Sequence, residues 1–469
     1  MPGRNLFAIV MVGAVSLLCW QTTQGARPKD NDDAMELYKL FVDAVEQVEA
    51  NYVRPVSRRE LLENALKGML QNLDPHSAFI NESDWKRFKR QIEGSFSGIG
   101  IQVGVDDGNR LMVIAPLVGT PAYSAGILAG DLILEIDGKS TEGFTSDKAV
   151  EVLQGRPGTS VKLKVLHAGP HKPEELTLTR SIIDVPSVLG DVRQPDGHWN
   201  YMIDKDKKIG YLRVTSFIQK TSDELKKALD ELKEQGMKAL ILDLRDNPGG
   251  LLSSAVEVSD LFIDEGKIVS TKGRNTPERT YEAQKDGTYT GFPMTVIVNE
   301  LSASAAEIVA ACLQDHDRAI IVGQRSFGKG SVQNILDLEN GNSVLKLTVA
   351  TYWRPSGKNI HRFKDAKESD DWGVKPNPGM EVKYTPEEHY AWGKSRIERD
   401  LISLNIHPKI PGLGPDETKG NRPKPDGAKA EENGEKKEHA EKPFVDRQLE
   451  KALEVLKEKL SPPEAKAAA

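Results

Sequence analysis

The chain has 469 residues, with 63 Lys and Arg against 70 Asp and Glu, so its formal net charge is −7 at pH 7. This length supports more than one domain and a large buried core. The mildly acidic balance argues against a nucleic-acid-binding protein. Of the two cysteines, Cys19 falls in an N-terminal leader and Cys312 on the apolar face of a helix. We therefore expect no internal disulfide and a core position for Cys312, rather than a thiol nucleophile.

The first 26 residues have the pattern of a secretory signal peptide. Arg4 supplies a positive charge, residues 6–20 are apolar, and small residues lie near Ala26. The apolar run is long enough to leave an uncleaved membrane anchor open as an alternative. We expect an exported protein of the periplasm or cell envelope, either free or associated with the membrane through its N-terminus.

Residues 27–93 form a predicted N-terminal helical region. Apolar residues recur at helical spacing over 36–51 and again over 59–73. The second helix ends at Asp74-Pro75-His76-Ser77, because proline cannot continue it. His76 is a conceivable partner for a serine nucleophile, but we assign it a turn or capping role, since a lysine further along supplies a base.

Residues 94–185 resemble a PDZ domain. The glycine-rich segment Gly98-Ile99-Gly100-Ile101 leads into a strand, as the carboxylate-binding loop of PDZ domains does. Backbone N–H groups in such a turn hold a terminal carboxylate, and the strand edge pairs with a peptide backbone. We predict that these four residues bind peptide, and that a helix over 146–153 forms the other wall of the groove.

Strands alternate with helices from residue 186 to about 405, which predicts α/β layering. Strands are expected at 209–214, 239–244, 295–298, 319–322 and 343–353, and helices at 222–235, 251–261 and after Ser304. Gly249 and Gly250 follow a buried strand and open a helix. Two glycines there let the backbone approach a ligand, although a plain strand-to-helix turn is the ordinary interpretation.

Ser302 and Ser304 stand between a buried strand and the next helix. A hydroxyl at a helix N-terminus lies beside unpaired N–H groups and the positive end of the helix dipole, which suits a developing oxyanion. An N-cap role is the common alternative for a serine there. The residues alone do not choose between the two serines.

Lys329 lies between Gly328 and Gly330, just after another buried strand, and Gln333 follows four residues later. A lysine buried in this way has a lowered pKa and can act as a general base. The phosphate-loop pattern fails at its last position: Gly323 stands five residues before Gly328-Lys329, but Gly330 follows where the pattern requires serine or threonine. His361 and His389 lack metal-ligand spacing, so no metal and no organic cofactor is predicted.

Two motifs together resemble the C-terminal processing (tail-specific) serine peptidase family: Asn-x-x-Ser-Ala-Ser-Ala-x-Glu over 299–307 and Gly-Lys-Gly-Ser-Val-Gln over 328–333. The resemblance implies that Ser304 is the nucleophile, Lys329 the base and Gln333 the residue that orients the lysine. It also implies an oxyanion hole made by the N–H of Ala305 and that of Gly249 or Gly250, without choosing between the glycines. Ser302 is then structural.

The expected fold is α+β and multidomain, with a crotonase-like or ClpP-like α/β peptidase core over 186–405, an inserted PDZ domain and the N-terminal helical region. The resemblance implies an exported serine endopeptidase with a Ser-Lys dyad. It would capture flexible protein C-termini in the PDZ groove and cleave near them. An adaptor protein and a homo-oligomer are both compatible with the sequence. Many family members carry an arginine where this chain has Gln154, so autoinhibition by the PDZ domain is also open.

Two other classes compete with a peptidase. One is a catalytically silent PDZ scaffold with a peptidase-like core, which is disfavoured because Ser304, Lys329 and Gln333 are all present. The other is an acyl-handling enzyme on crotonase-like layers, which would need a cofactor pocket and would leave the PDZ segment without a task.

The C-terminal part divides into three predicted segments. Residues 406–443 are rich in Lys, Glu and Pro and read as a flexible linker. Residues 444–460 have one narrow apolar helical face, which docks either on the body of the chain or on a second subunit. Residues 461–469 are a predicted disordered tail.

Overall fold

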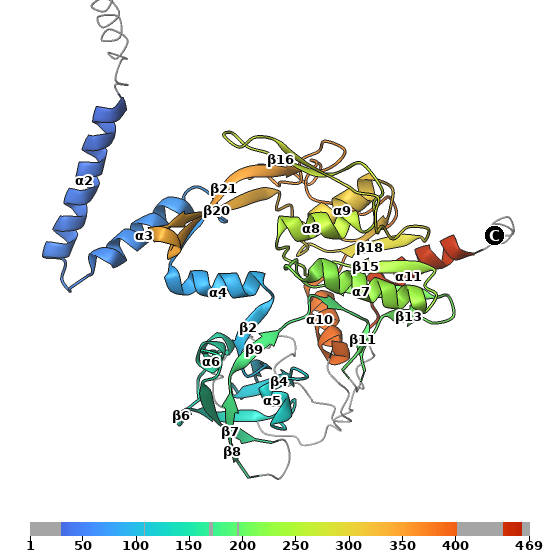
Figure 1. Cartoon of the computed structure of the whole chain (residues 1–469), viewed down its shortest axis with the longest axis horizontal. Helices are drawn as coiled ribbons and strands as arrows, with labels where there is room; N and C mark the ends of the chain where they lie inside the picture. Colours follow the sequence, from blue (N-terminus) through green and yellow to red (C-terminus); the bar gives the residue numbers. More distant parts are fainter. Residues whose placement is uncertain (1–29, 107, 168–171, 195–196, 401–443, 462–469) are drawn as a thin grey trace, which may run out of the picture.

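The structure, a computed structural model, describes residues 30–106, 108–167, 172–194, 197–400 and 444–461 (Figure 1). The predicted leader over 1–26, the predicted linker over 406–443 and all but the first residue of the predicted tail lie outside these ranges. None of the described helices has the length and apolarity needed to cross a bilayer.

A six-stranded sheet forms the centre of the larger body, in the order β10-β14-β15-β18-β19, with β13 also paired to β14. Its strands are β10 (Val188–Leu189), β13 (Met202–Asp204), β14 (Ile209–Val214), β15 (Ala239–Asp243), β18 (Met294–Val298) and β19 (Ile320–Gly323). Strands β14, β15, β18 and β19 run parallel, and every residue of β14, β15 and β18 is buried. Continuous apolar runs of this kind are expected where helices cover both faces of a parallel sheet.

Helices cover this sheet on both faces. The main hydrophobic core joins one face to α7 (Thr221–Glu234), α8 (Leu252–Asp260) and α9 (Ala305–Asp315), and the buried Cys312 belongs to it. On the other face, Ala452 and Leu456 of α11 (Arg447–Leu460) pack against residues of β14, β15, β18 and β19. The predicted C-terminal helix therefore docks on the body of its own chain and completes the core. Helix α10 (Pro386–Asp400) lies beside the hairpin of β11 (Val192–Arg193) and β12 (Trp199–Asn200).

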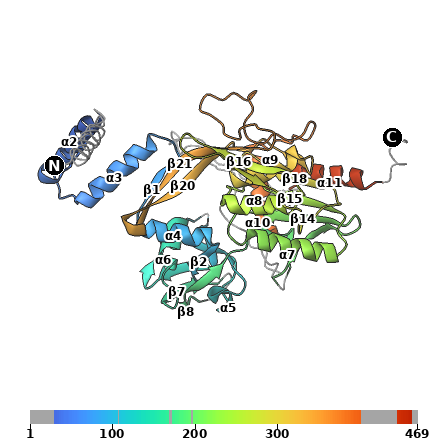
Figure 2. The ribbon, with the colours of Figure 1, turned by 45° about the horizontal axis from the view of Figure 1, so that its top comes forward.

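A second sheet reaches out from this core. Its order is β1-β21-β16-β17, with β20 paired to β21. The strands are β1 (Ala78–Ile80), β16 (Lys267–Lys272), β17 (Arg279–Glu282), β20 (Ser331–Leu338) and β21 (Ser343–Trp353). Strands β20 and β21 form a long antiparallel ribbon that runs from the core toward the N-terminal helices, with a short 3-10 turn, η1 (Glu339–Gly341), at its tip (Figures 1 and 2). Because β1 pairs with β21, the N-terminal region contributes a strand to the sheet that carries β20.

The N-terminal region contains α2 (Asp30–Asn51), α3 (Arg58–Gln71) and α4 (Glu82–Ile92). In both views α2 extends away from the body, beyond α3 (Figures 1 and 2). Large apolar side chains of α2 are exposed, among them Leu37, Leu40 and Phe41. Helix α4 then leads into the next unit through β2.

A separate unit is inserted in the sequence between α4 and the strands of the core. Its sheet has the order β3-β4-β5-β7-β8, with β6 paired to β5, and it has its own hydrophobic core. Its elements are β3 (Ile101–Val105), β4 (Leu111–Pro116), α5 (Pro121–Ser124), β5 (Leu132–Ile136), β6 (Lys139–Ser140), α6 (Ser146–Leu153), β7 (Ser160–Leu166) and β8 (Glu174–Thr179). Strands β2 (Ser95–Gly98) and β9 (Ser181–Asp184) pair where the chain enters and leaves, so the unit is an insertion with adjacent ends.

Candidate active site

Ser304 lies in the turn between β18 and α9, where it is the N-cap residue of the helix. Its backbone has φ 55° and ψ −113°, a conformation that a residue with a side chain rarely adopts. A serine held in a strained strand-to-helix turn is typical of hydrolase nucleophiles, because the turn presents the hydroxyl next to free helix N–H groups. The backbone thus distinguishes Ser304 from an ordinary capping serine.

Ser302, the other serine considered from the sequence, is fully buried. Its Oγ donates to the carbonyl of Leu244 at 2.8 Å and accepts the N–H of Asn299 at 2.9 Å. These bonds join the end of β15 to the turn after β18. The hydroxyl of Ser302 is therefore used to build the turn, in agreement with a structural role.

Glu307 connects the Ser304 turn to the loop that carries Lys329. Its Oε2 accepts the backbone N–H of Ser304 and that of Lys329, both at 2.8 Å. Its Oε1 accepts the hydroxyl of Ser326 and the N–H of Gly328, both at 2.6 Å. Burial raises the pKa of Glu307 to about 7, while these four hydrogen bonds act in the opposite direction. Sequence reasoning used Glu307 only as a motif marker, although its place three residues after an N-cap serine predicts a capping box.

Lys329 lies two residues before the start of β20 and is partly buried. Burial lowers the pKa of its amine, the ammonium of Lys346 lowers it further, and Glu307 opposes both. Within the described residues, no hydrogen bond joins the Lys329 amine to the Ser304 hydroxyl. Hydrogen bonds between catalytic groups often tighten only when substrate is bound. The structure therefore brings the two backbones to one carboxylate oxygen and leaves the dyad itself a prediction.

Gln333 lies on β20, directly opposite Thr348 of β21. Its side-chain nitrogen donates to Ser331 Oγ at 2.9 Å and to Thr348 Oγ1 at 3.2 Å. The carboxamide is thus held between two hydroxyls on the ribbon. Among the described residues, no hydrogen bond joins the Gln333 side chain to Lys329, so its role in orienting the lysine stays a prediction.

Gly249 packs against the Ser304 turn and Gly250 against the backbone of Phe217, and both have positive φ. A Cβ added to Gly249 would lie 2.7 Å from Ser304 Cβ and 2.9 Å from the nitrogen of Ala305, so only glycine fits there. The N–H of Gly249 donates to Asn247 Oδ1 at 2.8 Å. In the described part of the chain, the N–H groups of Gly250 and Ala305 donate no hydrogen bond, so both are available for an oxyanion.

The loop before Gly249 is anchored from the far end of the chain. Arg245 is buried, bonds Asp243 at 2.6 Å and bonds Asp446 Oδ1 at 2.9 Å. Asp446 is the N-cap residue of α11, and its side chain also accepts the N–H of Leu449. The guanidinium lies 4.6 Å from the ring centroid of Trp392. No sequence signal connects Arg245 to Asp446, because they are 201 residues apart.

The predicted peptide-binding segment lies where the inserted unit has an open sheet edge. Among the described strands, β3 pairs with β4 alone, and α6 lies alongside β3. Ile99 is buried in the unit's core, while Gly100 has φ 79° and fits closely against Thr120. A free strand edge beside a helix is suited to the addition of a peptide strand.

The end of α6 also carries a basic group, although not at residue 154. Gln154 is the C-cap residue of the helix. The guanidinium of Arg180 donates to the carbonyls of Leu153 at 2.9 Å and of Val152 at 3.1 Å. An arginine at a helix C-terminus satisfies carbonyls that have no partner within the helix. Arg180 thus closes this end of the helix in the absence of an arginine at position 154.

Of the remaining candidates, Cys312 and His389 take no part in this constellation. Cys312 is buried, which raises the pKa of its thiol to about 12. His389 bonds Asp246 at 3.0 Å. His361 lies against Gly330, next to Lys329. Burial and the charge of Lys329 both lower the pKa of the His76 imidazole, so His76 also lies near the predicted base. The described residues contain no cluster of His, Cys, Asp or Glu suited to a metal ion.

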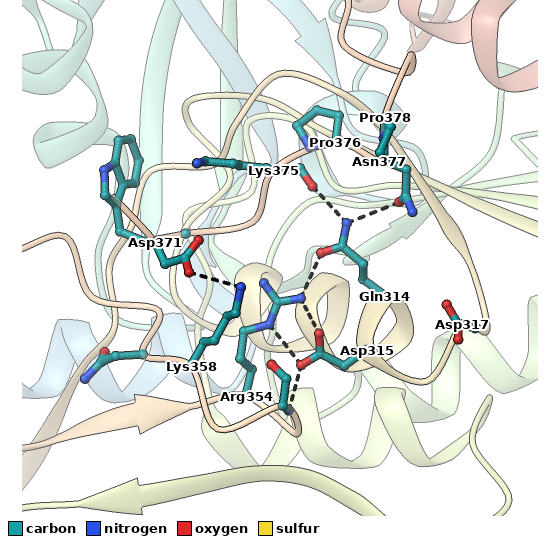
Figure 3. A pocket seen from close by; sticks show the side chains of 14 residues that line it. Gln314, Asp315, Asp317, Arg354, Lys358, Asp371, Lys375, Pro376, Asn377 and Pro378 are labelled. Carbon is teal, nitrogen blue, oxygen red and sulfur yellow. Dashed lines mark hydrogen bonds and ion pairs between the residues drawn. The ribbon is translucent and has the colours of Figure 1, made fainter. Parts of the chain in front are cut away.

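A hollow lies at the far end of α9 from Ser304 (Figure 3). It has a volume of about 400 Å³, and the residues that line it include neither Ser304 nor Lys329. Figure 3 shows that Arg354 is paired with Asp315, and Lys358 with Asp371. Because its charged groups neutralise one another, this hollow does not compete with the Ser304 region as the reaction centre.

Comparison with known proteins adds three family matches and several relatives. The model of peptidase family S41 matches residues 208–377, a PDZ domain model matches 86–166, and the model of the activating protease CtpB N-terminal domain matches 15–84. The chain is 41% identical over 326 residues to the carboxy-terminal-processing protease of Bartonella bacilliformis, covering 68% of this chain and 71% of that protein. It is 38% identical over 379 residues to the carboxy-terminal processing protease CtpA of Bacillus subtilis, covering 80% and 76%. Among solved structures, the photosystem II D1 C-terminal processing protease has 29% identity and a TM-score of 0.42, over 73% of this chain and 92% of its own.

Proposed function

Since the chain belongs to the carboxy-terminal-processing proteases of peptidase family S41, we propose that it is an exported endopeptidase with a Ser304–Lys329 dyad. In this proposal it captures the C-termini of other proteins in its PDZ groove and cleaves near them. The observation that carries the proposal is the Oε2 atom of Glu307, which accepts the N–H of Ser304 and the N–H of Lys329. A single buried carboxylate thereby holds a strained serine and a desolvated lysine in one place.

Substrate capture uses the open edge of β3. An extended C-terminal segment adds to this edge as a further strand, and its carboxylate meets the N–H groups of the Gly98–Ile101 turn. Backbone pairing of this kind recognises an extended chain with little demand on its sequence. It therefore suits flexible tails on many proteins.

The first chemical step is acylation. Neutral Lys329 accepts the hydroxyl proton of Ser304 as Oγ attacks the scissile carbonyl carbon. The resulting oxyanion is held by the N–H of Ala305 and the N–H of Gly250, because the N–H of Gly249 is already bonded to Asn247. Lys329 then gives its proton to the departing amine, and an ester to Ser304 remains.

The second step is hydrolysis of that ester. Lys329 again takes a proton, this time from a water molecule that attacks the ester carbonyl, and returns it to the Ser304 oxygen as the acid leaves. The lysine must be neutral at the start of both steps. Its lowered pKa favours that state.

Export rests on the leader pattern of residues 1–26, and it places the protein in the periplasm or cell envelope, free or held at the membrane by its N-terminus. Fractionation of the source cells, followed by N-terminal sequencing of the isolated protein, tests this. A protein found in the cytosol with its first residues intact would contradict export.

The dyad is tested with residues 27–469 and an unfolded protein substrate. Ser304→Ala and Lys329→Ala are expected to abolish cleavage, with losses of at least about a thousandfold. Exposed Ser253 and Lys358 supply matched controls as Ser253→Ala and Lys358→Ala, which should cleave like the wild type. Substantial cleavage by either dyad variant would reject the assignment.

The silent-scaffold alternative predicts a different pair of results. The wild type would then bind a peptide with a free C-terminal carboxylate, more tightly than the same peptide with an amidated end, yet cleave nothing. Binding and cleavage measured on one preparation separate these two functions.

A further inference from the structure

The turn at residues 74–77 was noted in the sequence for its proline, and the proposed mechanism gives it no task. In the structure it is bonded to the ribbon at a single residue, Thr348. The Thr348 hydroxyl donates to Asp74 Oδ1 at 3.2 Å, and the Thr348 N–H donates to Ser77 Oγ at 3.1 Å. Ser77 Oγ in turn donates to Asp74 Oδ2 at 2.7 Å. Main chain and side chain of Thr348 are therefore both held by the N-terminal region.

Asp74 is held in its ionised form. Partial burial alone would raise the pKa of its carboxyl, but hydrogen bonds from Ser77, His76 and Thr348 outweigh burial and lower it. An ionised carboxylate only accepts hydrogen bonds. The one hydroxyl proton of Thr348 must then point at Asp74, which leaves the Thr348 oxygen as an acceptor on its other side.

Gln333 meets Thr348 on that other side. Its carboxamide has a donating nitrogen and an accepting oxygen, and the acceptor state of Thr348 Oγ1 selects the nitrogen. Nε2 accordingly donates to Thr348 Oγ1 and to Ser331 Oγ. The carboxamide oxygen, Oε1, is left for a different donor.

The same face of the ribbon carries the base. Side chains alternate along a strand, so Gln333 shares a face with Ser331. Lys329 lies two residues before Ser331, and the charge of Lys346 acts on its amine. Thr348 is opposite Gln333, and Lys346 lies on the same face two residues along β21. Two amines, those of Lys329 and Lys346, thus lie near Oε1, and the proposed mechanism uses that of Lys329.

We infer that Asp74 and Thr348 are positioning residues that set the polarity of the Gln333 carboxamide, so that its Oε1 receives the Lys329 ammonium as it forms. The inference rests on the proposed function. The hydrogen bonds from Gln333 to Thr348 and from Thr348 to Asp74 form a relay. When this relay is intact, the carboxamide oxygen of Gln333 accepts a hydrogen bond from the Lys329 ammonium that forms. If the carboxamide were reversed, the Lys329 amine would face its N–H₂ group. That group repels an ammonium, so the proton transfer from Ser304 to Lys329 would be less favourable.

The charged and titratable groups around Lys329 come from several elements. Lys346 approaches from β21, Glu307 from α9 and His76 from the turn at residues 74–77, where Asp74 also lies. His361, in the loop after β21, contacts the backbone of Gly330 and completes this set. Thr348 is uncharged, so a substitution there leaves all of these charges in place and changes only the relay.

The test uses residues 27–469, a short peptide substrate and full pH profiles of kcat and KM. Thr348→Val removes the hydroxyl at almost constant shape. We expect kcat to fall about ten- to a hundredfold, KM to stay within about twofold, and the acid limb of the kcat profile to move to lower pH. The limb moves down because the ammonium of Lys329 loses a carbonyl partner. Thr348→Ser keeps the hydroxyl and should restore both the rate and the limb. Exposed Thr280 on β17 supplies the control, Thr280→Val, which should match the wild type.

Three results would overturn the inference while the wild type cleaves: an unchanged kcat in Thr348→Val, a lower kcat with an unmoved acid limb, or a failure of Thr348→Ser to restore activity. If circular dichroism shows that Thr348→Val does not fold, the pH profiles of kcat and KM are measured for Asp74→Ala instead. It frees the Thr348 proton to turn toward Gln333 and should give the same fall and the same shift. A wild type that cleaves nothing and is indistinguishable from Ser304→Ala points to failure of the proposed function instead.

Discussion

The proposed nucleophile, Ser304, and the proposed base, Lys329, lie on two sides of the site that belong to different parts of the molecule. Ser304 belongs to a turn between elements of the buried parallel sheet, and that turn is bonded to its neighbour, since the Ala303 N–H donates to the Asn247 carbonyl at 2.9 Å. Lys329 lies at the start of a ribbon that leaves the core, and its surroundings come from β21 and the N-terminal turn. The proposed nucleophile is therefore fixed by the core alone, whereas the proposed base is held to the core through Glu307 and is otherwise surrounded by segments that lie outside it.

This difference shows where the proposed enzyme can be adjusted. A displacement of the ribbon or of the N-terminal region would move Lys329 and Gln333 while the strained Ser304 turn stayed in place. Glu307 is the group that spans both sides, since its oxygens accept from each. Four changes test this division, in order of falling effect.

Glu307→Gln should have the largest effect, because it breaks the connection itself. A carboxamide has one accepting oxygen, so two of the four donors would face an N–H₂ group. We expect kcat to fall at least about a hundredfold and the free energy of unfolding to fall by roughly 2–6 kcal/mol. Peptide cleavage and urea unfolding measure the two, with the exposed Glu257→Gln as control. A variant as active as the wild type would show that the two sides are aligned without Glu307.

Asp446→Ala should loosen the nucleophile side through α11. It removes a buried partner of Arg245, and the expected loss in free energy of unfolding is about 3 kcal/mol, at the low end for such pairs because Asp243 remains. The pH profile of the folded variant should match that of the wild type, because Lys329 keeps its neighbours. Glu450→Ala, in the first turn of the same helix, is the control for urea unfolding. A moved acid limb in Asp446→Ala would contradict the division into two sides.

Lys346→Gln should affect the base side alone. Activity requires neutral Lys329 and is lost as pH falls through the pKa of that amine. The ammonium of Lys346 lowers this pKa, so its removal raises the pKa and moves the acid limb of kcat to higher pH, opposite to the shift expected for Thr348→Val. The plateau of kcat should change little. Lys272→Gln, on β16 of the same sheet, is the control, and a limb that moves down or stays in place would refute the assignment.

Arg59→Ala should have the smallest effect. Arg59 of α3 pairs with Glu339 at the ribbon tip at 2.7 Å, and both side chains are about half exposed, at 54% and 45%. Exposed ion pairs contribute little, because water screens them. Neither Tm nor the pH profile should change measurably. A clear loss of activity would mean that the N-terminal region controls the base through the ribbon tip, rather than through Asp74 and Ser77.

Much of the fold could be predicted from the sequence, because its signals are local. The strands expected at 209–214 and 343–353 occur with those bounds. A run of apolar residues, or an alternation of apolar and polar residues, predicts a strand even when its partner strands are unknown. The α+β fold class, the PDZ domain and the serine-type peptidase are confirmed by the family matches. The strained backbone of Ser304, by contrast, has no sequence signature beyond the motif.

The contacts that distinguish the two sides could not be predicted. Thr348 and Asp74 are separated by 274 residues, and Arg245 and Asp446 by 201, so neither pair produces a pattern in a short window. The docking site of α11 could not be predicted for the same reason. An amphipathic pattern shows that one face of a helix is buried, but it does not show which surface covers that face. The sequence left Gly249 and Gly250 equivalent as oxyanion donors, because the hydrogen bond from Gly249 to Asn247, on which the proposal of Gly250 rests, appears only in three dimensions.

The position of α11 also has a consequence for synthesis of the chain. The last strand of the parallel sheet, β19, ends at Gly323, whereas the helix that covers the sheet's second face ends at Leu460. At usual translation rates the ribosome needs roughly ten seconds to add the intervening residues. Until α11 docks, Ile209, Ile241 and Ile297 lack the cover that Ala452 and Leu456 give to this cluster. The second face of the parallel sheet is thus incomplete until α11 docks, so folding of the peptidase core depends on a helix that lies far along the chain from the last parallel strand.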